Sequence, residues 1–337
     1  MKKSTIVDIS RETNLSLGVI SKFLNGGNVR DKNKELIETA IKKLNYQVDE
    51  YARAMVTNRT NTIGIIVPEL FNTYYAMVAS EIDKCLNNSG YQTIVRESNF
   101  DLNREKDAIN WFVNRRIDAI IVVSNLKINE SADMYKDIET PMVFLDKIVE
   151  GINQDFVVVN NREITYEATK FLINNGHTKI AFISAPNNIY TSMERYKGYL
   201  QALKENGIEP DESLIYFVDE NPDSSYYVAK KIIAEKKSTA IFSSNYTSTL
   251  GTIFSLNEMN VKVPNDISLL GFDDIYLTNL FRPKLTIINQ PIHSIAHTTV
   301  KRVLDRLNDT DNKPNIKILN CELIKGESVL NLKEKSN

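Results

Sequence analysis

Apolar residues recur along this chain with two different spacings. In the first sixty residues they return every three or four positions, as on one face of an amphipathic helix, over Ile6–Glu12, Leu17–Leu24 and Asp31–Leu44. From residue 60 onward, short apolar runs alternate with longer segments of helical spacing. The pattern therefore predicts a small all-α module followed by a large α/β body.

The first two predicted helices are joined by a tight turn. Ser16 stands where its hydroxyl can accept hydrogen bonds from the free amides of the second helix, and Asn25-Gly26-Gly27 is a strong signal for a helix end. Two short helices, a tight turn and a third helix that completes the core are the helix-turn-helix arrangement, whose second helix enters the major groove of DNA by its N-terminal end. A three-helix bundle with no role in DNA binding is the alternative that this pattern leaves open.

Strand-like and helix-like segments alternate in two series after residue 60. Such alternation requires parallel sheets with helices on both faces, and two series indicate two lobes. The first series consists of Thr62–Val67, Tyr74–Asn87, Thr93–Arg96, Arg104–Asn114, Asp118–Val123, Met142–Leu145 and Val157–Val159. The second consists of Glu163–Asn174, Lys179–Ile183, Ser192–Glu205, Leu214–Phe217, Ser224–Ala234, Ala240–Ser243, Ser248–Asn257 and Ile267–Gly271.

Charge separates the two parts of the chain. Residues 1–60 carry eleven Lys and Arg and seven Asp and Glu, a net charge of +4, whereas the remainder carries −6. A basic module on an acidic body fits a protein that places one end on DNA. No run approaches the roughly 20 apolar residues of a membrane span, no apolar signal segment follows the first lysines, and Cys85 and Cys321 stand far apart. These features favour a reduced, cytoplasmic protein with two incidental thiols.

Several motifs occur in a fixed order over nearly the whole chain: TIVDISRETNLSLGVISKFLNGG (5–27), NYQVDEYARAMVTNRTNTIGIIVPEL (45–70), NNGHTKIAFIS (174–184), ERYKGY (194–199), VPNDISLLGFDD (263–274) and LTIINQP (285–291). In order and spacing the chain resembles the LacI/GalR family of bacterial transcription regulators. The resemblance implies a headpiece over residues 1–47, a hinge over 48–59 and a core over 60–337 with the two-lobed periplasmic sugar-binding fold. It places about 60–160 and 290–322 in the first lobe and about 161–289 in the second, so that helix Ser294–Leu307 and the last strands belong to the first lobe.

The resemblance also implies how DNA is read. The family uses the exposed start of its second helix, here Leu17, Gly18 and Lys22, and a hinge helix that wedges an apolar side chain, here Met55, into the minor groove. Lys22 is a point donor for a guanine where the bidentate fork of an arginine is common. The complete set of expected DNA-contacting residues is Thr5, Ser16, Leu17, Gly18, Ser21, Lys22, Asn25, Arg53 and Met55.

A small-molecule effector is expected in the cleft between the lobes, where parallel strands end. A sugar needs planar polar groups that hold its hydroxyls and an aromatic face against its ring. Tyr246 stands where the family often has aspartate, which predicts a more apolar pocket. The residues that the resemblance assigns to the effector are Tyr74, Tyr75, Asp146, Arg195, Asn245 and Asp273.

Motifs of catalysis are missing from the sequence: it has no Walker loop, GxSxG elbow, HExxH or CxxC. We expect no cofactor and no metal, and we assign His293 and His297 to capping or packing. The sequence thus predicts a homodimeric DNA-binding repressor whose affinity for a pseudo-palindromic operator is changed by a small molecule, a sugar or sugar phosphate. Control by a purine or by a protein corepressor, and a carbohydrate-acting enzyme with a DNA-binding head, are the alternatives.

Overall fold

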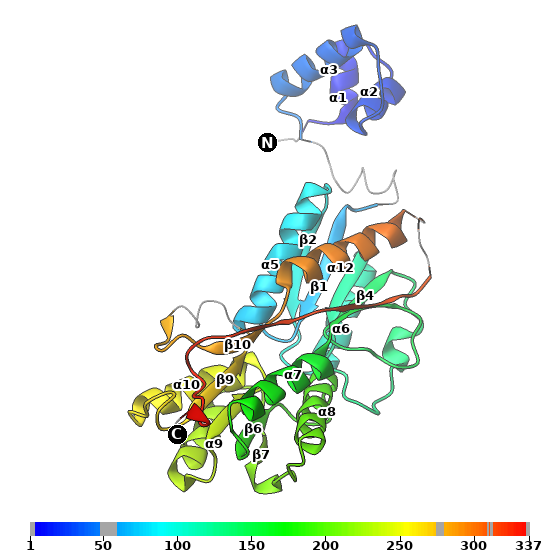
Figure 1. The fold of residues 1–337 in the computed structure, drawn as a ribbon. Coiled ribbons are helices and arrows are strands. Elements are labelled where there is room, and N and C mark those ends of the chain that lie inside the picture. Colours follow the sequence, from blue (N-terminus) through cyan, green and yellow to red (C-terminus); the bar gives the residue numbers. More distant parts are fainter. Residues whose placement is uncertain (1–3, 48–58, 274–279, 309, 311–312, 335–337) are drawn as a thin grey trace. The chain divides into compact units, whose positions relative to one another are not determined.

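The computed structural model describes residues 4–47, 59–273, 280–308, 310 and 313–334 (Figure 1). The chain divides into two compact units, Met1–Asn61 and Thr62–Asn337, and each is described by itself. Arg53 and Met55, expected to contact DNA from the hinge, lie outside the described residues.

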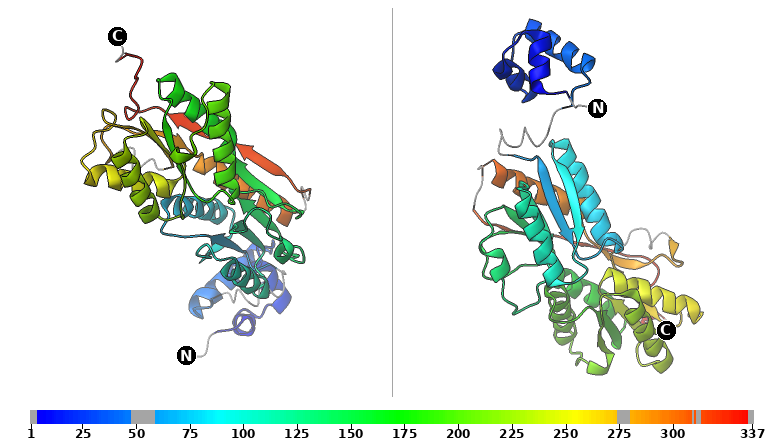
Figure 2. Two further views of the ribbon diagram at one scale, coloured as in Figure 1. Left: turned by 90° about the horizontal axis from the view of Figure 1, so that it is seen from below. Right: turned by 180° about the vertical axis from the view of Figure 1, so that it is seen from behind.

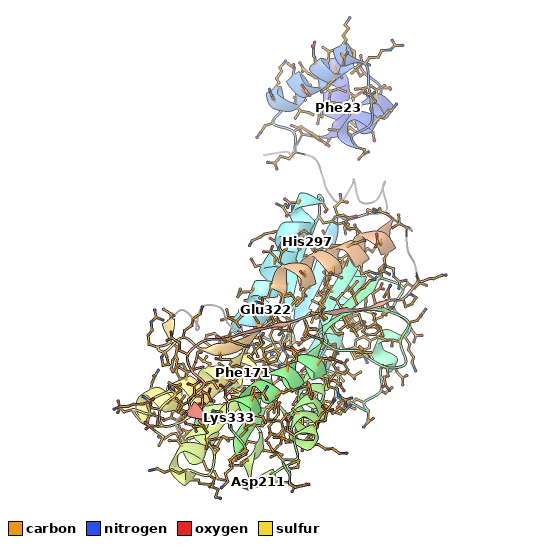
Figure 3. The ribbon with its side chains drawn as sticks, viewed as in Figure 1. Phe23, Phe171, Asp211, His297, Glu322 and Lys333 are labelled. Atoms are coloured by element: carbon orange, nitrogen blue, oxygen red, sulfur yellow. The ribbon has the colours of Figure 1, made fainter. Side chains whose placement is uncertain are left out.

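Three helices form the part of the first unit that is described, residues 4–47, and their bounds agree with the helical spacing to within one residue. They are α1 (Ile6–Thr13), α2 (Leu17–Leu24) and α3 (Asp31–Lys43). Ile9, Ile20 and Ile37, one from each helix, are completely buried together, and Phe23 of α2 packs against them (Figure 3). Because this core is small, the helix ends matter: the Ser16 hydroxyl accepts a hydrogen bond from the Val19 amide at 3.4 Å, as the sequence predicts.

The first lobe of the second unit is a six-stranded parallel sheet in the order β11-β5-β4-β3-β1-β2. Helices α5 and α12 lie side by side on one face, and α6 packs on the other (Figures 1 and 2). Strands β1, β3, β4 and β5 are buried almost throughout, which explains their continuous apolar runs. The bounds are β1 Thr62–Val67, α5 Thr73–Asn88, β2 Gln92–Glu97, α6 Leu102–Asn114, β3 Ala119–Val123, β4 Met142–Leu145, β5 Asp155–Val159, α12 Ile292–Leu307 and β11 Ile316–Leu319.

The second lobe repeats this plan with strand order β12-β10-β9-β8-β6-β7. Helices α7 and α8 cover one face, and α9 and α10 cover the other. Helices α7 and α8 approach closely at Gly198, where an added Cβ would lie 2.2 Å from the Arg162 carbonyl oxygen. The bounds are α7 Asn161–Asn174, β6 Ile180–Ser184, α8 Tyr190–Glu205, β7 Ile215–Phe217, α9 Pro222–Glu235, β8 Ala240–Ser243, α10 Tyr246–Glu258, β9 Ser268–Phe272, β10 Thr286–Asn289 and β12 Glu322–Ile324; two 3₁₀ turns span Asp133–Tyr135 and Glu212–Leu214.

The last strand corrects one expectation. Both final strands were predicted in the first lobe, but only β11 is there; β12 pairs antiparallel with β10 in the second lobe. Ser328, which follows β12, also holds this segment on the second lobe, because its hydroxyl donates to the Leu269 carbonyl at 2.6 Å and accepts from the Thr286 amide at 2.8 Å. The segment then continues along the second lobe from Glu322 to Lys333 (Figure 3).

The chain crosses between the lobes three times: from β5 to α7, from β10 to α12, and from β11 to β12. The first and third crossings are hydrogen-bonded to each other, since the Asn160 amide donates to Leu319 O at 3.0 Å and the Cys321 amide to Asn160 Oδ1 at 2.8 Å. Within the described part of the chain, no helix is both long and apolar enough to cross a membrane.

Candidate functional site

A narrow cavity with a mainly polar lining lies between the two lobes of the second unit. The carboxyl ends of the strands surround it, as expected for parallel sheets: Asp146 directly follows β4, Asp273 follows β9, and Ser184 ends β6. The lining residues are Asn72, Tyr74, Tyr75, Asp146, Ser184, Ala185, Thr191, Ser192, Arg195, Glu220, Asn245, Tyr246, Thr247, Asp273 and Gln290. The structure therefore brings together all six residues that the sequence assigned to an effector.

Arg195 is held rigidly at the base of this cavity. Its side chain is 5% exposed. Nε donates to Asn161 Oδ1 at 2.7 Å, Nη1 donates to the Ser244 carbonyl at 2.7 Å, and the guanidinium carbon lies 3.7 Å from the Phe272 ring centroid. Nη2 makes no hydrogen bond to any described residue, so this end of the guanidinium is ready for a ligand oxygen.

A chain of polar contacts crosses the cavity. The Tyr74 hydroxyl, at the start of α5, lies 3.5 Å from Asp146 Oδ1 and 3.2 Å from Gln290 Oε1. Gln290 Nε2 in turn donates to Asp273 Oδ1 at 2.8 Å. The chain thus connects an acid of the first lobe to an acid of the second, and a ligand among these groups contacts both lobes.

Tyr246 has a different role from the one predicted. Its hydroxyl lies 3.0 Å from Thr73 Oγ1, so it forms a polar contact between α10 and α5 instead of only making the pocket more apolar. Tyr75 is 8% exposed, and its ring centroid lies 5.3 Å from that of Tyr74. These rings supply the aromatic surface of the cavity.

Asn245 combines a structural contact with a place in the cavity wall. Its Oδ1 caps α10 by accepting from the Ser248 amide at 2.8 Å and from the Thr247 hydroxyl at 3.1 Å. These bonds fix the side chain, and its amide nitrogen remains for a ligand.

Sequence reasoning missed several polar residues of the cavity, among them Glu220 and Gln290. Gln290 follows β10 inside the recognised motif LTIINQP, so its position at a strand end was an available signal. Glu220 follows the three-residue edge strand β7 by three positions, in a loop with several acids, and nothing in the sequence distinguishes it from them.

The electrostatics of the cavity are dominated by buried acids. Burial raises the pKa of Glu220 to about 7, although Lys147 and Arg195 act in the opposite direction. Burial also raises the pKa of Asp146. The pKa of Tyr74 is raised well above its ordinary value by burial and then by Asp146 and Asp273. Glu220 and Asp146 therefore keep their protons to a higher pH than solvent-exposed carboxyl groups do.

The first unit exposes the residues expected to read DNA. Leu17 is 47% exposed at the start of α2, which is high for an apolar side chain, and Lys22 is also exposed. An added Cβ at Gly18 would meet no heavy atom within 4 Å. Thr5, Ser16 and Asn25 are exposed and Ser21 is half-buried, so the described members of the predicted set are accessible.

The two histidines form no metal site in the described ranges, where no group of three His, Cys, Asp or Glu residues is placed to hold an ion. The rings of His293 and His297 are 4.2 Å apart. His293 Nδ1 lies 2.9 Å from Glu81 Oε1, so the pair connects α12 to α5.

Comparison with known proteins agrees with this architecture. Residues 169–329 match the family described as periplasmic binding protein-like domain. The HTH-type transcriptional repressor PurR of Vibrio atlanticus (strain LGP32) is 31% identical over 334 residues, covering 98% of this chain and 99% of that protein. Catabolite control protein A of Priestia megaterium is 30% identical over 308 residues, covering 90% and 92%. The solved lac repressor dimer bound to operator and the anti-inducer ONPF has a TM-score of 0.88 over 98% of this chain and 100% of that one; at 22% identity this likeness shows the fold.

A helix-turn-helix unit on the same chain as a two-lobed core with a cavity between its lobes defines a class of ligand-responsive transcription regulators. The two relatives named above are a transcriptional repressor and a catabolite control protein. The chain belongs to the LacI family and is a DNA-binding transcriptional repressor modulated by an effector.

Proposed function

We propose that this repressor binds a pseudo-palindromic operator as a homodimer, and that a polar small molecule, a sugar or sugar derivative, fills the cavity between its lobes and changes operator affinity. The observation that carries the proposal is the cavity itself, where Arg195 offers Nη2 and the Tyr74–Gln290–Asp273 chain connects the lobes. A solved structure with a similar fold is that of a transcriptional regulator CelR–cellobiose complex. This similarity supports a carbohydrate as the ligand class.

On the DNA side, the proposal assigns base contacts to α2. Leu17 meets a thymine methyl, Lys22 donates to a guanine, and Ser21 reaches a base edge or a phosphate. Thr5, Ser16 and Asn25 face the DNA backbone from the helix ends, and Arg53 and Met55 of the hinge remain predictions from the family pattern.

Ligand binding and operator binding are coupled by thermodynamic linkage. A ligand that contacts both lobes favours one angle between them, and the first lobes of a dimer carry the hinges. A difference of about 1–3 kcal/mol between the two states changes operator affinity about 5- to 150-fold. The sign, induction or corepression, depends on which angle the ligand favours.

The test has two parts. First, the full chain is used to select double-stranded DNA from a random library, and the selected DNA is titrated by anisotropy. We expect a pseudo-palindromic sequence, and we expect sedimentation to show that it binds a dimer of the protein. A thermal-shift screen against sugars, sugar phosphates and purines is expected to give a hit, since ligand at 100 times its Kd adds about 2.7 kcal/mol of stability. The hit must change the affinity for the selected DNA.

Each result discriminates between alternatives. Intact operator binding without any small-molecule hit points to a protein corepressor, and turnover of a sugar points to an enzyme. The variant Arg195→Lys retains the charge but lacks the fork; it is expected to lose the ligand response while operator binding in the absence of ligand is unchanged.

A further inference from the structure

Glu220 is an acid in the cavity with no hydrogen-bond partner. It lines the cavity from the loop between β7 and α9, and its carboxylate receives no hydrogen bond from any residue that the structure describes. Glu220 is half-buried, and a carboxylate withdrawn from water without a donor is costly to keep ionised. Its presence in a ligand cavity indicates that the missing donor belongs to the ligand.

We propose that the effector is a phosphate-free polyol, uncharged or amine-bearing, and that Glu220 is a ligand-contacting residue that selects this class over phosphorylated sugars. The inference rests on the proposed function, because it concerns the same cavity. The inference keeps unphosphorylated sugars as the ligand class and excludes sugar phosphates.

The charges of the cavity wall support this selection. Three carboxylates line it, from Asp146, Glu220 and Asp273, against one guanidinium, that of Arg195. Lys147 lies close by but is buried, and its ammonium donates to the Leu126 carbonyl at 2.7 Å. A phosphate would bring up to two further negative charges into this site, whereas hydroxyl or ammonium groups would satisfy acceptors already present.

The donors in the wall are largely engaged by the protein. The Ser192 hydroxyl donates to the Ala185 carbonyl, and the Thr247 hydroxyl donates to Asn245 Oδ1. Among the side chains that the structure describes in the lining, the Asn72 amide, the Tyr75 hydroxyl, the Thr191 hydroxyl, Nη2 of Arg195 and the Asn245 amide remain as donors. Apart from Nη2 of Arg195 these donors are uncharged, so they do not offset the added charge of a phosphate.

Helix N-termini add some positive potential, which must be weighed. Each contributes about half a unit charge at most. Side chains of Asn72, Asn221 and Asn245 already cap α5, α9 and α10, while α7, α8 and α12 begin without a side-chain cap. At about half a unit charge each at most, these three helix ends together do not offset three carboxylates.

A neighbouring hollow does not supply the missing positive charge either. It is bordered by the loops after β3 and β4 and by α8. Its three lysines are matched by three glutamates, and Lys197 pairs with Glu194 at 2.7 Å. A phosphate that extended from the cavity into this hollow would therefore meet a balanced set of charges: Lys127, Lys147, Lys197, Glu130, Glu150 and Glu194.

The experiment compares matched ligands on the full chain at pH 8, above the pKa of about 7 of Glu220. Pentoses, hexoses and disaccharides are each tested as the free sugar, the amino sugar and the phosphate ester by thermal shift, and hits are titrated calorimetrically. We expect hits only among free and amino sugars. In Glu220→Gln, affinity for the best hit should fall about tenfold or more, as for loss of a hydrogen bond to a charged group, and the discrimination against its phosphate ester should shrink. Glu150→Gln, an exposed glutamate of the neighbouring hollow, should change neither value.

Opposite results separate the two proposals. A phosphate ester that binds more tightly than its parent sugar and shifts operator affinity overturns this inference and leaves the proposed function intact. The inference is also overturned if Glu220→Gln has the same ratio of affinities for the free sugar and its phosphate ester as the wild type. No hit in any of the three sets, with operator binding intact, overturns control by a sugar and this inference with it.

Discussion

Replacing Glu220 with glutamine should make the stability of the empty protein less dependent on pH. The pKa of Glu220 is raised from 4.5 to about 7, first by burial. Below pH 4.5 the residue is protonated in both the folded and the unfolded state and contributes nothing. Between pH 4.5 and 7 only the unfolded chain releases the proton, so the free energy of unfolding falls as pH rises and then levels off. At about 1.4 kcal/mol per pH unit, the wild type loses about 3 kcal/mol that Glu220→Gln does not lose.

Urea unfolding at several pH values measures this difference. Circular dichroism follows the helices, and fluorescence follows Trp111, the single tryptophan of the chain, which lies in α6 with the Arg115 guanidinium 3.7 Å from its ring centroid. The stability difference between Glu220→Gln and wild type should grow by about 3 kcal/mol from pH 4.5 to pH 8, while Glu150→Gln should parallel the wild type. A difference that stays constant over this range would show that Glu220 is well solvated, and the electrostatic argument for the cavity would be wrong.

The structure also sets the expected effects of four other substitutions. Lys22→Ala should weaken operator binding by about 1–3 kcal/mol in anisotropy titrations, with no change in thermal stability because the side chain is exposed; equal affinity would exclude Lys22 as a base reader. Gly18→Ala has open space for its methyl group and should stabilise the first unit by up to about 1 kcal/mol, and a lower melting temperature would contradict this. Tyr74→Phe removes the hydroxyl near Asp146 and Gln290 and should cost about 0.5–1.5 kcal/mol in urea unfolding. Gly198→Ala should be strongly destabilising by the same assay, because its Cβ would overlap the Arg162 carbonyl.

Much of the fold could be predicted because buried strands appear in the sequence as continuous runs of apolar residues. Strands β1, β4 and β8 have the bounds that their apolar runs indicate, since strands covered on both faces admit few polar side chains. Polar residues directly after such strands, such as Asp146 and Asp273, were recognisable for the same reason.

Other features depend on partners that sequence spacing does not encode. The segment that follows β12 is bonded to β9 and β10 through the Ser328 hydroxyl, and both strands are distant from Ser328 in sequence. Glu220 follows a short edge strand in a polar loop, so its burial arises only when the first lobe covers it. The hydroxyl of Tyr246 meets Thr73 across the cleft, and no local pattern relates the two residues.

The three crossings between the lobes have a mechanical consequence. Two lobes joined by a single chain segment can rotate and translate relative to each other in several directions. Three connecting segments leave mainly rotation about one axis. The hydrogen bonds among Asn160, Leu319 and Cys321 tie two of these connections to each other and reduce the remaining freedom further. Ligand binding at the cavity should therefore act mainly on the angle between the two lobes. Substitutions that stiffen the connecting segments should change the range of this angle without altering a contact to the ligand or to DNA.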